Sequence, residues 1–135
     1  MNLQKKIDSF FNGSPFAVVG ASQDREKYGN KVLRAYLQKE FDVFPVNPNA
    51  ELIEGVQTYA RLKDLPKPVH GISIITPPAV TERIVQDAGE AGIKHIWMQP
   101  GAESESAIAR CNKLGINVIG GDACLLVVVG FRETT

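Results

Sequence analysis

Short apolar runs recur along this chain at nearly regular intervals, and this alternation restricts the possible folds more than any other feature. The runs begin close to residues 16, 42, 70, 95 and 117, so consecutive starts are 22 to 28 residues apart. An interval of this length fits one strand and one helix. Parallel strands need crossovers, and helical crossovers cover both faces of a sheet. The pattern therefore predicts an α/β fold with one doubly wound, mostly parallel sheet of about five strands and helices on both faces.

Amphipathic stretches precede and separate these runs. Four apolar residues at helical spacing predict an N-terminal helix at about 3–11. Three further stripes each predict a crossover helix; they consist of Val32, Leu33, Tyr36 and Leu37, then Val80, Ile84, Ala88 and Ala91, then Ile108, Cys111 and Leu114. Gly92 and Gly115 follow the last two stripes as helix stops, and 61–65 predicts a single helical turn. No linker composition divides the 135 residues, so we expect one domain over 1–135.

Charge and composition exclude several classes of function. Fifteen Lys plus Arg balance fifteen Asp plus Glu, so the whole chain has no basic excess that attracts nucleic acid or an anionic membrane. The longest apolar run, 124–131, is far shorter than the ~20 residues of a membrane span, and the first residues lack the apolar core of a signal peptide. The two cysteines have neither zinc-site nor disulfide-framework spacing. We expect a cytoplasmic protein without metal, membrane or nucleic-acid partners.

The loop after the first strand is the first candidate site, because ligands of such sheets bind at the carboxyl ends of the strands. Gly20, Ala21 and Ser22 are small enough for backbone N–H groups to approach a phosphate at the start of the next helix. The same residues also fit an ordinary strand-to-helix turn. A dinucleotide site would need glycine in place of Ser22 and Arg25, and an acid within 46–48, so the sequence disfavours NAD but not every adenine nucleotide.

Several short motifs follow one another in a particular order. They are Val18-Val19-Gly20-Ala21-Ser22, Lys27-Tyr28-Gly29, Pro45-Val46-Asn47-Pro48, Glu54-Gly55, Tyr59, Leu62 to Pro66, Thr76-Pro77, Gly92-Ile93-Lys94, Trp97-Met98-Gln99-Pro100-Gly101 and Asp122-Ala123-Cys124. Their order and spacing over 14–124 resemble the CoA-binding domain family, stand-alone Rossmann-like domains related to the nucleotide-binding part of the succinyl-CoA synthetase alpha subunit. The sequence departs from the family pattern at His70, Gly71 and Ala123, and in its more apolar tail.

The resemblance implies that the ligand is coenzyme A or an acyl-CoA. It places the pyrophosphate on Gly20, Ala21 and Ser22, the adenosine beside Asn47 and Pro48, the pantetheine arm along Thr76, Pro77 and Pro78, and the closing side of the crevice at Met98, Gln99 and Gly101. The 3′-phosphate of CoA requires a local cation, which Lys27 supplies best among Arg25, Lys27 and Lys31. Ordinary solvated surface charges are the alternative for all three.

No catalytic constellation is recognisable in the sequence. His70 and His95 begin strands, so we expect both at the end of the sheet away from the crevice. Cys124 could face a bound thiol, but a buried cysteine without a reactive role fits the sequence better. Cys111 and Trp97 fit core positions. We therefore expect a carrier, sensor or regulatory module without chemistry of its own, and leave open whether the chain is an enzyme.

Other functions remain as alternatives. One is an NAD(P)- or other nucleotide-binding oxidoreductase, another is an acyl-CoA ligase subunit, and a third is an interaction domain with a vestigial crevice. The apolar tail 125–131 favours packing or self-association over ligand binding, so a homo-oligomer or a protein partner also fits the sequence.

Overall fold

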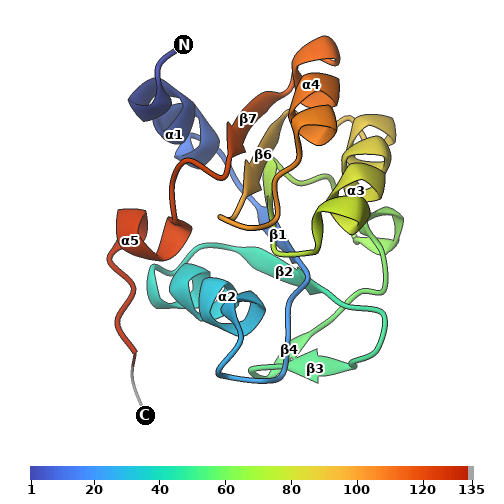
Figure 1. The fold of residues 1–135 in the computed structure, drawn as a ribbon. Coiled ribbons are helices and arrows are strands. Elements are labelled where there is room, and N and C mark those ends of the chain that lie inside the picture. Colours follow the sequence, from blue (N-terminus) through green and yellow to red (C-terminus); the bar gives the residue numbers. More distant parts are fainter. Residues whose placement is uncertain (134–135) are drawn as a thin grey trace.

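The apolar runs form the five strands of one parallel sheet in the order β2-β1-β5-β6-β7, as predicted (Figure 1). The computed structural model describes residues 1–133. The elements in chain order are α1 (Leu3–Phe11), β1 (Phe16–Val19), α2 (Tyr28–Gln38), β2 (Val43–Val46), β3 (Leu52–Ile53), β4 (Val56–Gln57), the short 3₁₀ helix η1 (Leu62–Asp64), β5 (Gly71–Ile74), α3 (Pro78–Glu90), β6 (His95–Met98), α4 (Glu105–Lys113), β7 (Asn117–Gly120) and α5 (Leu125–Val129). The result is a Rossmann-like α/β fold.

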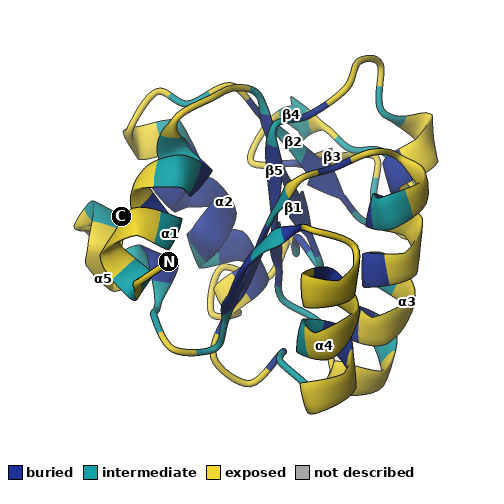
Figure 2. Ribbon diagram, turned by 90° about the horizontal axis from the view of Figure 1, so that it is seen from above, coloured by how far each residue is buried: buried dark blue, intermediate teal, exposed yellow. Residues whose placement is uncertain are grey.

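The strand order reverses beside β1. Val19, the last residue of β1, pairs in parallel with Val46 of β2 on one side and with Ile74 of β5 on the other. The chain leaves β1 through α2 on one face of the sheet, and it leaves β5 through α3 on the opposite face (Figure 2). Because the two helices diverge there, a crevice opens between the carboxyl ends of β1 and β5.

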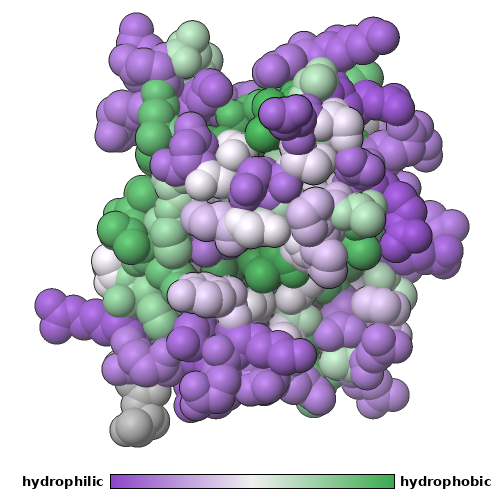
Figure 3. All heavy atoms as spheres, in the orientation of Figure 1, coloured by the Kyte–Doolittle hydropathy of each residue, from purple (hydrophilic) through white to green (hydrophobic). Residues whose placement is uncertain are grey.

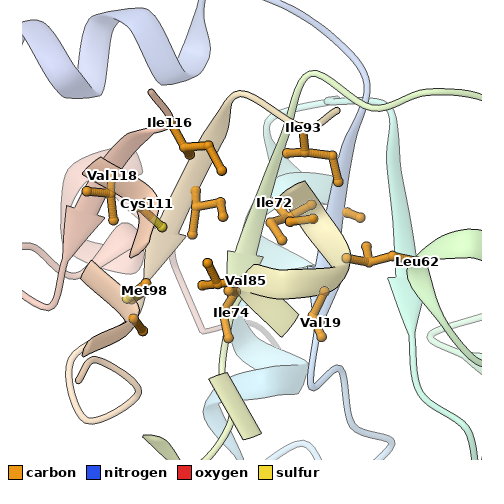
Figure 4. Packing of buried hydrophobic residues seen from close by; sticks show 14 of the residues in the cluster. Val19, Leu62, Ile72, Ile74, Val85, Ile93, Met98, Cys111, Ile116 and Val118 are labelled. Atoms are coloured by element: carbon orange, nitrogen blue, oxygen red, sulfur yellow. The ribbon is translucent and has the colours of Figure 1, made fainter. Parts of the chain in front are cut away.

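Two hydrophobic cores fill the space between the sheet and its helical layers. Successive strand residues point to opposite faces, so Ala17 and Val19 belong to the core under α3 and α4, whereas Phe16 and Val18 belong to the core under α1, α2 and α5. Figure 4 shows the first core, which is largely aliphatic and contains Cys111. The second core is aromatic and contains the fully buried Trp97. The core positions predicted for this cysteine and this tryptophan are confirmed.

Two residues at helix ends differ from the predicted stripes. Ala91 is exposed, and the buried face of α3 consists of Thr81, Val85 and Ala88. Leu114 is exposed as well. Each is the C-cap residue of its helix, where the backbone turns away from the sheet, so the apolar stripe stops one residue earlier than the periodicity predicts. The predicted stops at residues 92 and 115 are confirmed, since both glycines have left-handed backbone.

Two small elements were not predicted from the sequence. The first is the antiparallel hairpin of β3 and β4, whose turn is the expected Glu54-Gly55, with φ of 51° and 76°. The second is α5, which packs against α2 and leaves Val127 and Val128 exposed as an apolar patch on the surface (Figure 3).

The two histidines lie at the end of the sheet opposite to the crevice, as predicted. His70 directly precedes β5 and His95 begins β6, and their rings stack with centroids 4.2 Å apart. His70 Nε2 lies 3.1 Å from the carbonyl oxygen of Ser9 in α1, which covers this end. No helix within 1–133 is long and apolar enough to cross a membrane, and the same residues hold no cluster of three His, Cys, Asp or Glu side chains suited to a metal ion.

Candidate functional site

A cavity of about 810 Å³ occupies the crevice at the carboxyl ends of β1, β2 and β5, a size typical of small-molecule sites. We call it the first cavity. Its wall contains the loop after β1, the start of α2, the end of β2, the segment before η1, the loop after β5 and one face of α3. The lining residues used below are Gly20, Ala21, Ser22, Glu26, Lys27, Tyr28, Gly29, Asn47, Pro48, Arg61, Ile75, Thr76, Pro77, Val80, Ile84 and Asp87.

The loop after β1 requires glycine at two points of close backbone approach. Gly20 has a φ of +92°, and a side chain there would collide with the carbonyl oxygen of Ile75 at the end of β5. A side chain on Gly29 would collide with the carbonyl oxygen of Gly20 itself. These contacts hold the start of α2 directly against the end of β1, so the helix N-terminus reaches the cavity wall.

This wall presents backbone donors without acceptors. Among residues 1–133, no protein acceptor meets the N–H groups of Ala21 and Ser22, or those of Tyr28 and Gly29 in the first turn of α2. The N-cap residue of α2, Lys27, provides no side-chain cap either. Open N–H groups and the positive end of a helix dipole together favour an anion such as phosphate.

Two asparagine side chains hold carbonyl groups of this loop by hydrogen bonds. Asn47 Nδ2 donates to the carbonyl oxygen of Ala21 over 2.8 Å, and the fully buried Asn30 donates to that of Ser22 over 3.0 Å. Asn47 Oδ1 in turn accepts from the amide of Asn49 at 2.7 Å. Asn47 is therefore a positioning residue for the loop, and the amide expected beside the adenosine is already occupied by protein groups.

Asn30 is held by the buried guanidinium of Arg34. Arg34 Nε donates to Asn30 Oδ1 over 2.6 Å, Nη2 donates to the carbonyl oxygen of Arg25 over 3.2 Å, and Nη1 pairs with Glu133 Oε1 at 2.5 Å. The hydrogen bond from Arg34 lowers the pKa of the Glu133 carboxyl. A buried charge needs such partners, so the guanidinium fixes the loop and residue 133 together.

Of the three cations predicted near the loop, only Lys27 lines the cavity. Arg25 pairs with Glu54 of the hairpin turn at 3.4 Å, and Lys31 lies over the Tyr28 ring, 5.6 Å from its centroid. A further cation, Arg61, lines the cavity from the segment before η1. Nothing in the local sequence marks Arg61, because the path of the hairpin brings it to the wall.

A second cavity, of about 470 Å³, adjoins the first toward the end of β6. Tyr28, Ile75, Thr76 and Pro77 line both cavities, so the two spaces adjoin along these residues. The remaining lining residues of the second cavity are Gln99, Pro100, Gly101, Ala102 and Cys124. Gln99 is almost fully buried; its Oε1 accepts from the amide of Leu125 at 2.7 Å and its Nε2 donates to Cys124 Sγ at 3.3 Å.

Most of the expected site residues gather along these two cavities, but two do not. Met98 is fully buried, and its side chain points into the core under α3 and α4 (Figure 4). Pro78 begins α3 and lines neither cavity. Thr76 lies 2.8 Å, oxygen to oxygen, from the hydroxyl of the buried Thr81, and this contact fixes the start of α3 beside the crevice. Sequence reasoning did not assign Tyr28, Val80 or Ile84 to the wall; the apolar spacing of the last two was the available signal.

Several known proteins similar to this chain have names that refer to coenzyme A. The sequence matches the family described as the CoA binding domain over residues 14–130. It is 30% identical over 127 residues to the alpha subunit of an ADP-forming acetate–CoA ligase II from Pyrococcus furiosus, covering 84% of this chain and 27% of the subunit. The chain thus spans little more than a quarter of that relative.

Two solved structures agree with this match. A conserved hypothetical protein from Pyrococcus furiosus is 43% identical with a TM-score of 0.79, over 84% of this chain and 97% of that one. A dinucleotide-forming acetyl-coenzyme A synthetase 1 from Ca. Korarchaeum cryptofilum, in its apo form, is 31% identical with a TM-score of 0.75, over 84% of this chain and 27% of the synthetase. The hypothetical protein is similar in length to this chain, and the synthetase contains a similar domain within a larger protein.

Proposed function

Since this chain belongs to the family of CoA binding domains, we propose that it binds coenzyme A or an acyl-CoA along the first and second cavities. The observation that carries the proposal is the set of open backbone N–H groups on Ala21, Ser22, Tyr28 and Gly29, four residues that line the first cavity at the positive end of α2. In this proposal the pyrophosphate accepts hydrogen bonds from these groups.

The rest of the ligand follows from that anchor. The adenosine lies toward Pro48 and Arg61 at the β2 side of the first cavity, and Lys27 binds the 3′-phosphate. The pantetheine arm runs along Thr76 and Pro77 toward the second cavity, which those residues also line. The apolar residues of α3, Val80 and Ile84, cover the first cavity on the side away from the loop.

We propose a role as a carrier, sensor or regulatory module for the bound ligand. The titratable side chains that line the two cavities within 1–133 are Glu26, Lys27, Tyr28, Arg61, Asp87 and Cys124. None of them forms a hydrogen bond with a histidine among the described residues, whose two histidines lie at the other end of the sheet. No acid–base pair that involves a histidine therefore lines the cavities within 1–133, which supports a binding role.

A ligase subunit is the second candidate, and the 30% identity to the alpha subunit of an acetate–CoA ligase favours it. In that case the chain supplies the CoA site, and other protein segments supply the reacting groups. The two candidates differ in what the chain does alone: a carrier binds CoA with full affinity by itself, whereas a ligase part gains affinity when its complement is added.

Thermal unfolding with added ligands tests the proposed function. CoA at about 100 times its dissociation constant should add about 2.7 kcal/mol to the unfolding free energy, which raises the Tm of a domain of this size by several degrees. NAD at the same concentration should raise it much less. The variant Ala21→Leu should show no rise in Tm on addition of CoA, because the larger side chain prevents the phosphate from reaching the loop.

Ala79→Leu is the matched control for this variant, since Ala79 is exposed on α3 and lines neither cavity. It should respond to CoA as the wild type does. Equal Tm shifts from CoA and NAD, or an unchanged CoA response in a folded Ala21→Leu variant, would contradict the proposal.

A further inference from the structure

The second cavity adjoins the first beside Thr76 and Pro77, where the thiol end of CoA arrives in the proposed binding mode. It shares Tyr28, Ile75, Thr76 and Pro77 with the wall of the first cavity, so a ligand chain that passes Thr76 leads toward it. Its volume of about 470 Å³ exceeds what a terminal thiol needs. The cavity therefore has room for a further chemical group attached to the sulfur.

Gln99 offers this group one hydrogen-bond donor in a fixed direction. The amide of Leu125 binds Gln99 Oε1 at 2.7 Å, which determines which end of the side-chain amide is nitrogen. One N–H of Nε2 points to Cys124 Sγ at 3.3 Å, and among residues 1–133 the other has no acceptor. Since only 3% of Gln99 is exposed, a carbonyl oxygen in the cavity is the natural partner of that second N–H. A thioester has such an oxygen, and a free thiol does not.

The charges around the cavity restrict the group further. None of the residues that line it is an Asp, Glu, Lys, Arg or His. A carboxylate lies beside the cavity wall, since Glu103 Oε1 accepts from the amide of Gly101 at 2.7 Å. A carboxylate on the ligand would lose its water without finding a cation, and it would face Glu103.

We infer that the second cavity binds the acyl group of an acyl-CoA with a short, uncharged chain, and that Gln99 Nε2 donates to the thioester oxygen. The inference rests on the proposed function, because it assumes that the CoA part occupies the first cavity. It makes the acyl-thioester, and not free CoA, the preferred ligand, and it excludes dicarboxylic acyl groups.

Calorimetry under reducing conditions with four ligands tests the inference on the whole chain. Acetyl-CoA should bind more tightly than CoA, and butyryl-CoA about tenfold more tightly than acetyl-CoA, because it buries two more methylene groups. Succinyl-CoA, with a chain of the same length as butyryl-CoA, should bind at least tenfold more weakly than butyryl-CoA. Equal affinities for all four would overturn the inference and leave the proposed function intact, whereas no binding of any of them would overturn both.

Two variants locate the effect within the structure. Cys124→Leu fills part of the second cavity, so it should weaken the binding of butyryl-CoA at least tenfold more than it weakens the binding of CoA. Glu103→Gln keeps an oxygen that accepts from the amide of Gly101 but removes the negative charge. It should therefore reduce the difference in affinity between butyryl-CoA and succinyl-CoA.

Glu105→Gln is the matched control for the charge change, because Glu105 is exposed in the first turn of α4 and lines neither cavity. It should leave the ligand preference unchanged. If Cys124→Leu weakens CoA and butyryl-CoA by the same factor, or if the two glutamate variants behave alike, the acyl group does not lie in the second cavity.

Discussion

The side-chain amide of Asn47 donates a hydrogen bond to the carbonyl oxygen of Ala21 across 2.8 Å, joining the end of β2 to the loop after β1. Asn47→Asp replaces this donor with a carboxylate that faces the carbonyl oxygen. The loop should then lose its fixed orientation, and CoA affinity measured by calorimetry should fall about tenfold.

Asn49→Asp is the control, since only the backbone amide of Asn49 takes part in this arrangement. It should bind CoA with nearly wild-type affinity. Equal losses in the two asparagine variants would show that an added negative charge, and not the lost hydrogen bond, weakens binding.

Gly29→Ala should destabilise the fold. The new methyl group meets the carbonyl oxygen of Gly20, which is backbone and cannot rotate away. Overpacking of this kind typically costs 1–3 kcal/mol, or several degrees of Tm in a domain of about this size. Gly89→Ala in α3 is the comparison, because its methyl group meets only the exposed end of Leu114 and alanine favours the helix. A Gly29→Ala protein as stable as the Gly89→Ala protein would refute the close approach.

Lys27→Ala should distinguish CoA from dephospho-CoA. If Lys27 binds the 3′-phosphate, its loss removes a hydrogen bond to a charged group, worth about 1.5–3 kcal/mol or roughly ten- to 150-fold in affinity. Dephospho-CoA, which lacks that phosphate, should bind both proteins alike. Arg25→Ala should affect neither ligand strongly, because Arg25 pairs with Glu54 and lies outside the cavity wall. Equal losses for both ligands in Lys27→Ala would place the lysine at the pyrophosphate.

Acidification should destabilise the protein through His95. Burial, and to a lesser degree the neighbouring His70, lowers the pKa of His95 in the folded chain. Between that lowered pKa and the unfolded value of about 6.5, the unfolded chain binds more protons, so the unfolding free energy rises with pH. This contribution is complete above about pH 6.5 and is lost as the pH falls below it.

Urea unfolding at pH 7.5 and pH 5 measures this effect. His95→Asn should show a smaller difference between the two pH values than the wild type. Parallel pH dependences in the two proteins would mean that other groups control acid sensitivity.

The strands could be predicted because each is a short run of buried residues at a regular interval. Phe16 to Val19 are all buried, as expected for a parallel sheet covered on both faces. Such a run can be recognised from its own residues, without knowledge of the strands beside it. The two-residue strands β3 and β4 have no period to detect. Helix α5 starts where Gln99 accepts from the amide of Leu125, a contact between residues far apart in sequence that no local pattern shows.

The same distinction applies to the site. The sequence points to Gly20, Ala21 and Ser22 because they are small residues that directly follow a strand, where ligands of such sheets bind. Met98 ends its strand with its side chain toward the core, so the cavity wall begins one residue later, at Gln99. Arg61 reaches the wall only because the hairpin folds back, and such a position depends on tertiary structure.

Arg34 connects the ligand loop to a remote segment of the chain. Its guanidinium holds Asn30, which holds Ser22 of the loop, and the same group binds Glu133 beside the C-terminal end. Ligand binding at the loop and binding at Glu133 both depend on the Arg34 side chain, so each changes the free energy of the other. Such coupling is reciprocal. A phosphate that orders the loop should therefore also order residues 131–133. Conversely, a group that binds Glu133 should increase the order of the loop. A spectroscopic probe on that segment would report occupancy of the crevice without touching the ligand.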